Sequence, residues 1–352
     1  MNSNVRYTLI LISLALLTGC LRDGPLHLNS SAKETAQLLN KLTPKLMEKH
    51  RVPGLSVAIL QNGQTSIIET FGYRNLETKQ KITNDTVFQA ASLGKPIFAY
   101  IVTSLAEKDQ FDLSKPLFDY LGELAIENNS ESKTITARMI LSHSSGLPNF
   151  GEGEITLHSK PGTAFRYSGH GYQYLQKAVE KAAQKSLSKL ADEIVFQPLK
   201  MQRSSYVWRD KYRDDFAKSY DNEQKPIPLG KYPAQGFAAW SLFTTIGDYA
   251  KFVSHIINSS QSKDSIAKKL IREHSHINSD LAWGLGWGIQ KTEPNHSIWH
   301  WGSKSGFKHY VVAYPKEGIA IIIMANGSNA FRMIDDIMAN AIGGSYPSYD
   351  WF

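Results

Sequence analysis

The sequence predicts an α/β (α+β) fold in which one antiparallel sheet takes strands from both ends of the chain, helices flank the sheet, and a mainly helical lobe is inserted. Strand patterns occur at residues 55–68 and return only at residues 282–325. Between about 110 and 245 the pattern is mostly helical with long irregular connections, and no strand run is found. A chain of 352 residues is long enough to bury the core of such a domain.

The first helix is predicted by its cap. Ser31 and Glu34 form a Ser-x-x-Glu capping box, which opens a helix that runs to about residue 50. The apolar residues of this segment recur at helical spacing, so we expect them to form one buried stripe. They are Leu38, Leu39, Leu42 and Leu46.

The next elements are a hairpin and a second helix. Segments 55–60 and 65–68 flank Asn62 and Gly63, and an Asn-Gly pair is the strongest short signal for a hairpin. The apolar run after Ser92 predicts a helix to about residue 107, with an irregular first turn because Pro96 lacks a backbone N–H. The chain therefore enters the sheet before it reaches Ser92.

The C-terminal third returns to the sheet. A Pro-Lys-Glu turn joins its last two strands as a hairpin, and a final helix at 330–342 ends at Gly343 and Gly344. We therefore expect one domain over residues 32–345, with its helical lobe at about 110–245 and a tail at 346–352. The expected strands are 282–290, 297–302, 310–314 and 318–325.

Charge and composition limit the classes of partner. The net charge of +7 is spread thinly over a chain that is 20% charged and 42% hydrophobic. No run of like charges is long enough to act as a nucleic-acid-binding arm or an acidic tail, so we expect no nucleic-acid partner. Cys20 is the one cysteine in the sequence, which rules out an intramolecular disulfide.

The N-terminus has the pattern of an export signal. Arg6 precedes the apolar stretch 8–17, which is too short for a permanent membrane helix. The sequence Leu17-Thr-Gly-Cys20 resembles a bacterial lipobox, which makes 1–19 a lipoprotein signal peptide, Cys20 the lipidated N-terminus and 20–31 a tether. An aspartate directly after the lipidated cysteine would resemble an inner-membrane retention signal, and Leu21 stands there instead. The protein is therefore expected on the outer membrane, facing the periplasm. The alternative is a simple cleaved signal beside an incidental cysteine.

Ser92 and Lys95 are the first candidates for chemistry. They stand three residues apart at a helix start, so their side chains share one face. A serine hydroxyl needs a nearby base to become a nucleophile, and a lysine serves if burial holds its amine neutral. Ser-x-x-Lys alone is a weak signal, and the alternative is an N-cap serine followed by a surface lysine.

Two further segments carry candidate groups. Tyr167 lies in a turn-rich loop and can relay protons beside a lysine, although a packing role is the alternative. In the strand 297–302, alternation places His300 and Gly302 on one face and the neighbouring tryptophans, Trp301 included, on the other. A glycine there lets a ligand lie against the strand, and the N–H just beyond it can bind an oxyanion.

Taken together, these residues resemble the serine β-lactamase and penicillin-binding protein family, in the branch of class C β-lactamases, DD-peptidases and esterases. Ser92-Leu-Gly-Lys95 matches its Ser-x-x-Lys motif, Tyr167-Ser-Gly169 lies where it has Tyr-x-Asn, and His300-Trp-Gly302 lies where it has Lys-Thr-Gly or His-Thr-Gly. The resemblance extends from residue 52 to the last strands. Further segments similar to the family are 141–148, 241–252 and 283–288.

The resemblance implies a β-lactamase/transpeptidase-like fold and an acyl-enzyme mechanism without metal or cofactor. Ser92 would attack a carbonyl, and Lys95 and Tyr167 would share proton transfer. The backbone N–H groups of Ser92 and Ser303 would stabilise the oxyanion. His300, with Trp301, Gly302 and Gly169 around it, would orient the substrate.

Departures from the family pattern bear on the substrate. Gly169 replaces an asparagine that contacts substrate amides, and His300 replaces a permanent cation with a side chain whose ordinary pKa leaves it mostly neutral at pH 7. We therefore expect a serine hydrolase of esterase type, acting on a small molecule or a cell-wall peptide, with a lipid bilayer as its anchor. The alternatives are a β-lactamase or D-Ala-D-Ala carboxypeptidase, and a non-catalytic or slowly acylated penicillin-binding lipoprotein.

Three histidines receive structural interpretations. His274 and His276 have metal-like spacing, but no carboxylate or cysteine set surrounds them, so we expect a solvated loop and no metal site. His143 lies in a Ser-His-Ser-Ser-Gly turn and is expected to hold the loop rather than donate protons.

Overall fold

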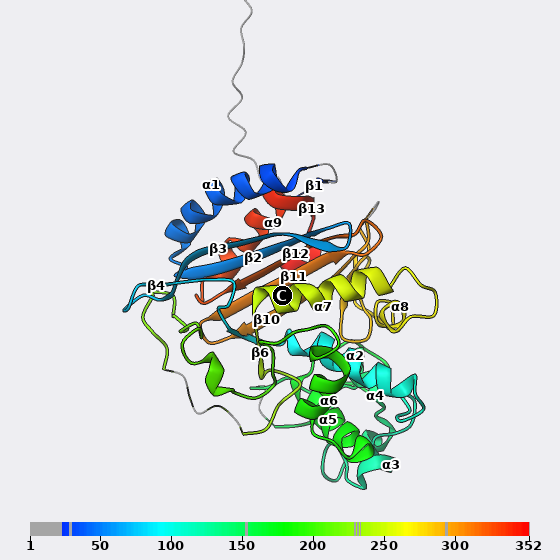
Figure 1. Cartoon of the computed structure of the whole chain (residues 1–352). Coiled ribbons are helices and arrows are strands. Elements are labelled where there is room, and N and C mark those ends of the chain that lie inside the picture. Colours follow the sequence, from blue (N-terminus) through cyan, green and yellow to red (C-terminus); the bar gives the residue numbers. More distant parts are fainter. Residues whose placement is uncertain are drawn as a thin grey trace, which may run out of the picture.

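The computed structural model describes residues 23–27, 30–151, 154–228, 230, 232, 234–292 and 295–351. Its centre is a nine-stranded antiparallel sheet in the order β4-β3-β2-β12-β11-β10-β9-β8-β7 (Figure 1). The N-terminal part supplies β2 (Gly54–Gln61), β3 (Gln64–Asn75) and β4 (Gln80–Lys81). The C-terminal part supplies β7 (Ser275–His276), β8 (Leu281–Trp283), β9 (Gly288–Gln290), β10 (Ser297–Lys304), β11 (Phe307–Tyr314) and β12 (Ile319–Ala325).

The two halves of the sheet join where β12 pairs with β2, with Ile322 opposite Ala58. This pairing confirms the prediction of one antiparallel sheet built from both ends of the chain. The predicted hairpin is also present, because Asn62 and Gly63 connect β2 to β3 with φ angles of 51° and 68°. Both residues lie in the left-handed region that a tight two-residue turn demands.

The sheet separates two hydrophobic cores, which alternation along β12 makes visible. Ile321 and Ile323 point into the core under α1 (Ala32–His50) and α9 (Ile334–Ile342). Ala320 and Ile322 point the other way, into the core shared with α2 (Gly94–Ala106), α7 (Ile246–Ser259) and α8 (Ile266–Leu270). Figure 1 shows α1 and α9 on one side of the sheet and α7 with the helical lobe on the other.

In the part of the chain that the structure describes, the regular secondary structure of the inserted lobe is helical apart from one short strand, and long irregular connections separate its helices. Its α-helices are α3 (Phe118–Leu121), α4 (Ala137–Leu141), α5 (Gly169–Ala183) and α6 (Leu187–Ala191). Short 3-10 turns at Ser130–Thr134 and Asp210–Tyr212 and a π turn at Asp192–Phe196 complete it. The structure adds a pair of strands that the sequence did not indicate: β6 (Leu242–Thr244) pairs with β5 (Phe88–Ala91).

Four local predictions need correction. In α1, Leu38 is 37% exposed, whereas Thr35, Thr43 and Met47 join the buried face. The single strand expected at 282–290 is two strands, β8 and β9, which pair with each other around a turn. Part of the expected tether forms β1 (Asp23–Leu26), and it pairs with β13 (Gly343–Ser345). The expected C-terminal tail contains α10 (Pro347–Trp351).

The predicted signal peptide 1–19 and Cys20 lie outside the described residues. Within the described ranges, no helix combines the length and the apolar character needed to span a bilayer.

Candidate active site

Ser92 stands in a tight turn between β5 and α2. Ala91, just before it, has a φ of 51°, a left-handed conformation that costs a residue with a Cβ about 1 kcal/mol or more. The backbone N–H of Lys95 donates to the carbonyl of Ser92 at 3.0 Å. The helix begins at Gly94, its N-cap is Leu93, and that cap uses no side chain. The alternative of an N-cap serine is therefore wrong, and Pro96 falls in the first helical turn, where a missing N–H costs nothing.

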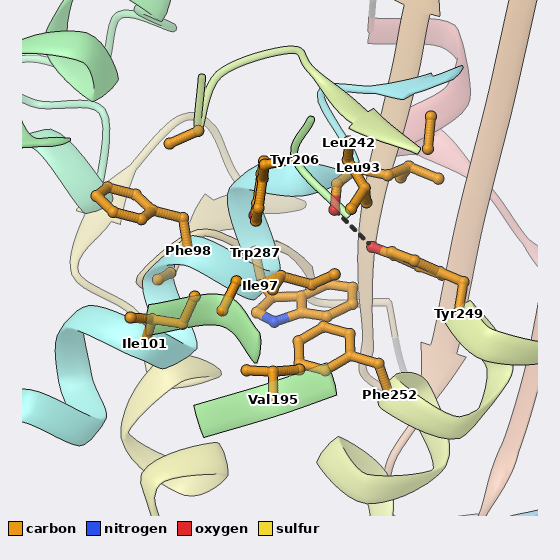
Figure 2. Close-up of a cluster of buried hydrophobic side chains, with 14 of the residues drawn as sticks. Leu93, Ile97, Phe98, Ile101, Val195, Tyr206, Leu242, Tyr249, Phe252 and Trp287 are labelled. Carbon is orange, nitrogen blue, oxygen red and sulfur yellow. Dashed lines mark hydrogen bonds between the residues drawn. The ribbon is translucent and has the colours of Figure 1, made fainter. Parts of the chain in front are cut away.

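Two buried tyrosines hold this turn in place by donating hydrogen bonds to its backbone carbonyl groups. The Tyr249 hydroxyl donates to the carbonyl of Leu93 at 3.2 Å (Figure 2). The Tyr206 hydroxyl donates to the carbonyl of Gly94 at 2.5 Å. Figure 2 shows α2 surrounded by apolar side chains from the lobe, from α7 and from the loop that carries Trp287. A dense core of this kind fixes the turn, so Ser92 is presented on a rigid support.

Lys95 is only 1% exposed, although lysine is almost never fully buried without a partner. Its Nζ lies 3.0 Å from Ser92 Oγ and donates to the carbonyl of Ala239 at 2.7 Å. No carboxylate among the described residues forms an ion pair with it, and burial lowers its pKa from 10.5 to about 7. The alternative of a surface lysine is wrong, and with this pKa about half of the Lys95 amines are neutral at pH 7.

Tyr167 reaches the same point from the lobe, just before α5. The Lys95 Nζ lies 4.9 Å from the centroid of its ring. Its hydroxyl oxygen is buried and has no hydrogen-bond partner among the described residues. Burial raises the pKa of Tyr167, and the nearby Ser92 hydroxyl opposes part of that rise. The side chain is therefore a phenol, able to donate a proton, at neutral pH.

His143 holds Tyr167 from both sides. Its backbone carbonyl accepts the N–H of Arg166 at 2.6 Å, and its ring Nδ1 accepts the N–H of Ser168 at 3.1 Å. Its ring also packs on the Tyr167 ring with centroids 4.3 Å apart. Because Nδ1 accepts, the proton of the neutral ring is on Nε2. The expected loop-holding role is present, and it acts on the two residues that flank Tyr167.

His300 is fully buried in β10 beside the same group. Its Nδ1 lies 2.7 Å from the carbonyl of Trp301, and since a carbonyl only accepts, Nδ1 carries the proton. Burial, with the Lys95 amine nearby, lowers the pKa of His300 to about 3. The pKa of His300 thus lies below the ordinary histidine value on which the sequence-based expectation of a mostly neutral side chain rested. His300 is neutral throughout the physiological range, and its Nε2 is a buried acceptor with no partner among the described residues.

Gly302 has a different role from the one expected. A Cβ at this position would meet the carbonyl oxygen of Ala90 at 2.3 Å, so the backbone of β5, rather than a ligand, lies against the glycine. His309, opposite Gly302 on β11, donates from Nε2 to the carbonyl of Gln89 at 3.0 Å. No sequence pattern indicates a role for His309. Gly302 and His309 together hold β5, and hence Ser92, against the sheet.

Ser303 and its neighbours form the open end of β10. Pairing with β9 covers only residues 297–299, so residues 300–304 are paired on the β11 side alone. Ser303 is exposed, and its Oγ accepts from Lys308 Nζ at 2.7 Å. The structure thus brings Ser92, Lys95, Tyr167 and His300 together, while Trp301 packs on Tyr167 with ring centroids 4.7 Å apart.

No group of three or more His, Cys, Asp or Glu suited to a metal ion occurs within the described ranges. His276 instead lies 3.6 Å from Glu273 on an exposed segment. Burial lowers the pKa of His274 to about 4.

The family follows from a profile match that covers most of the domain. The profile described as Beta-lactamase matches residues 39–344. This range includes the nine-stranded sheet, the inserted lobe and the four site residues Ser92, Lys95, Tyr167 and His300. The chain belongs to the β-lactamase family.

Two named proteins are similar to the chain at low sequence identity. Protein flp of Staphylococcus aureus (strain N315) is 23% identical over 323 residues, which cover 83% of this chain and 63% of that protein. The chain therefore spans less than two thirds of the length of protein flp. Penicillin-binding protein 4 of Amycolatopsis lactamdurans is 22% identical over 332 residues, covering 85% of this chain and 87% of that protein.

Solved structures agree on the β-lactamase fold. An octameric penicillin-binding protein homologue from Pyrococcus abyssi superposes with a TM-score of 0.74 at 22% identity, over 88% of this chain and 77% of that one. A class C beta lactamase superposes with a TM-score of 0.77 at 20% identity, over 90% and 99%. At such identities the likeness shows the fold alone.

One departure from the family pattern has a structural explanation. Gly169 is the first residue of α5, and a Cβ there would meet the Phe150 ring at 2.3 Å. Its N–H donates to Asn149 Oδ1 at 3.0 Å. Phe150 is 39% exposed and fills the space beside Gly169. An aromatic face thus stands where the family often places an asparagine side chain.

Proposed function

We propose that the chain is a serine hydrolase that transfers an acyl group from an ester or amide to water through an acyl-enzyme on Ser92. The observation that carries the proposal is the buried Lys95 amine, which lies 3.0 Å from Ser92 Oγ and has a pKa of about 7. A neutral amine has one lone pair. With one N–H engaged by the Ala239 carbonyl, that lone pair is available to the Ser92 hydroxyl.

In the acylation step, Ser92 Oγ forms a bond to the substrate carbonyl carbon while its proton passes to Lys95. Tyr167, held as a phenol by burial, then donates its proton to the leaving group as the carbonyl reforms, and it is reprotonated from the Lys95 ammonium. Lys95 is then neutral again. It can accept a proton from the water that attacks the acyl carbon, and it returns that proton to Ser92 Oγ as the bond between the acyl carbon and Oγ breaks, so one base serves both halves of the reaction.

The oxyanion of the tetrahedral intermediate needs two donors. We assign the backbone N–H groups of Ser92 and Ser303, which flank the nucleophile in the turn before α2 and at the open end of β10. The support for this assignment is the rigid contact of Gly302 with the β5 backbone, which holds the two segments in register.

An ester is the substrate class that fits the site best. His300 contributes no positive charge near neutral pH, and Gly169 contributes no amide side chain. At these two positions the site therefore lacks the contacts by which the family pattern recognises the acylamino group and the adjacent carboxylate of a β-lactam, whereas a short-chain ester needs neither contact and has the better leaving group. Similarity to Penicillin-binding protein 4 makes a β-lactam or D-Ala-D-Ala peptide the second candidate.

Two measurements test the proposal: whole-protein mass spectrometry after labelling identifies the nucleophile, and turnover rates identify the preferred substrate class. A fluorophosphonate should add one label to the wild type, on Ser92, and none to Ser92→Ala, whose folding is checked by its melting temperature. Labelling of another serine, such as Ser144 or Ser168, would refute the nucleophile. Faster turnover of penicillin than of a short-chain ester at pH 8 would refute the ester preference and leave the nucleophile intact.

We also propose that the protein is an exported lipoprotein anchored through Cys20, on the strength of the Leu17-Thr-Gly-Cys20 sequence. Wild-type protein should fractionate with membranes and carry a diacylglycerol and an acyl chain. Cys20→Ser should release it or stall its processing. Soluble wild-type protein that begins a few residues from Cys20 would contradict the anchor.

A further inference from the structure

Lys304 is the last residue of β10, and it meets the lobe at one end of the candidate site. Its Nζ lies 4.2 Å from the centroid of the Trp240 ring. Trp240 is itself fixed by the Phe237 ring, which stacks on it at 4.9 Å and 12°. This pair joins the sheet to the loop that precedes β6.

Both residues lie near Ser92 because each is close in sequence to a residue that contacts Ser92 or the strand leading to it. Trp240 comes directly after Ala239, whose carbonyl lies 3.4 Å from Ser92 Oγ and 2.7 Å from Lys95 Nζ. Lys304 comes two residues after Gly302, which packs on the carbonyl of Ala90 in the strand that leads to Ser92. Two residues of a strand span about 7 Å. Lys304 and Trp240 therefore lie near Ser92, Lys304 on β10 and Trp240 on the loop before β6.

The charge of Lys304 has no counterpart. The side chain is half-buried, and among the described residues no carboxylate pairs with it and no acceptor takes its ammonium protons. Lys308 on the neighbouring strand, by contrast, donates to the Ser303 hydroxyl. Burial lowers the pKa of Lys304, which reflects the cost of removing the cation from water. The Trp240 face offsets part of that cost, and an anion beside it would offset more.

We propose that Lys304 and Trp240 form a binding site for an anionic group, a carboxylate, carried by the ester or amide substrate. Lys304 supplies the charge that His300 does not, and the Trp240 ring supplies an apolar face for the carbons next to the carboxylate. The inference rests on the proposed function and narrows its substrate class. Esters that carry a carboxylate within reach of Lys304 are then better substrates than neutral esters of the same size.

The experiment compares matched esters in wild type and in Lys304→Gln, which keeps the length of the side chain and removes its charge. The pairs are p-nitrophenyl butyrate against mono-p-nitrophenyl succinate, and phenyl acetate against 3-acetoxybenzoate. They place the carboxylate on the acyl group or on the leaving group. We expect Lys304→Gln to lower kcat/KM about tenfold for at least one of the two carboxylate esters, which is the size expected for loss of a hydrogen bond to a charged group. The kcat/KM of the neutral ester in the same pair should change less than about twofold.

The control is Lys81→Gln. Lys81 Nζ lies 3.8 Å over the Tyr73 ring on the edge strand β4, so this variant removes the same charge and the same kind of contact away from Ser92. It should leave both esters of a pair unchanged. Equal effects of the two variants would assign the selectivity to overall charge and overturn the site. So would equal effects of Lys304→Gln on charged and neutral esters.

A binding measurement separates this inference from the proposed function. In Ser92→Ala, isothermal titration calorimetry with the same esters reads recognition without turnover. Tighter binding of the carboxylate ester in Ser92→Ala than in Ser92→Ala with Lys304→Gln supports the site even when no ester is hydrolysed. Equal binding by the two proteins overturns it, whatever the hydrolysis results are.

Discussion

The pKa of Lys95 makes the pH dependence of acylation a direct test of the mechanism. Its lowering from 10.5 to about 7 corresponds to a burial cost of about 5 kcal/mol, at 1.36 kcal/mol per pKa unit. The titratable groups around Lys95 are the rings of Tyr167 and Tyr172, at 4.9 and 5.5 Å, and the buried, neutral His143 and His300. None of them supplies a negative charge at neutral pH, so nothing restores the ordinary pKa.

The neutral fraction of Lys95 sets the expected profile. It is about one tenth at pH 6 and about nine tenths at pH 8. With a neutral ester, kcat/KM should therefore rise about tenfold between pH 6 and pH 8 and then level off, because kcat/KM reports the free enzyme. A lysine with an ordinary pKa would instead give a tenfold rise per pH unit up to about pH 10. Such a continued rise between pH 8 and pH 9.5 would refute the neutral-amine mechanism.

The same burial predicts the pH dependence of stability. Between about pH 7 and pH 10 the unfolded chain holds the Lys95 proton and the folded chain does not, so the free energy of unfolding rises with pH in this window. Below pH 7 the full cost is present. Lys95→Met should accordingly stabilise the fold at pH 6, by up to about 5 kcal/mol, and remove this part of the pH dependence. Urea titrations of both proteins at pH 6 and pH 9.5 measure the difference.

Further predictions concern the residues around the nucleophile. His143→Phe keeps the ring but strands the buried Ser168 N–H, so kcat should fall at least tenfold with little change in KM, whereas His143→Asn restores an acceptor, tolerates the positive φ of 55° and should recover part of kcat. Steady-state kinetics of the two variants decide this, and equal losses would contradict it. Gly302→Ala would press on the Ala90 backbone and should cost roughly hundredfold in acylation rate and about 1–3 kcal/mol of stability. Gly169→Ala meets only the half-exposed Phe150 ring, which can move, so melting and kinetics close to wild type are expected, and a loss as large as that of Gly302→Ala would show that the Phe150 ring is fixed.

The main sheet was predictable because its strands are long and regular. The hairpin at Asn62 and the alternation of β12 carry their own signals, which depend only on neighbouring residues. The pairs β5–β6 and β1–β13 carry none. Each is three or four residues long, and its partner is more than 150 residues away in the chain, so no periodicity could reveal it. Short strands of this kind form because the surrounding fold brings them together.

The candidate site was predictable in its residues but not in their states. Motif order placed Ser92, Lys95 and Tyr167 together, and the structure does bring them together. The neutral state of His300 follows from its burial, which one side chain in a strand pattern does not reveal. The partner of the Lys95 amine was invisible for another reason: it is the backbone carbonyl of Ala239, and the type of side chain at that position says nothing about it.

The pairing of β1 with β13 fixes how an anchored molecule would stand on its membrane. Asp23 begins β1 only three positions after Cys20, a length that spans on the order of 10 Å when fully extended. With a lipid on Cys20, the end of the molecule that carries α1, β1 and β13 would face the bilayer, and the helical lobe would point away from it (Figure 1). A connection this short would limit how far the domain could rotate relative to the membrane. The enzyme would then sample substrates that diffuse within one molecular diameter of the surface, at a nearly constant height above it.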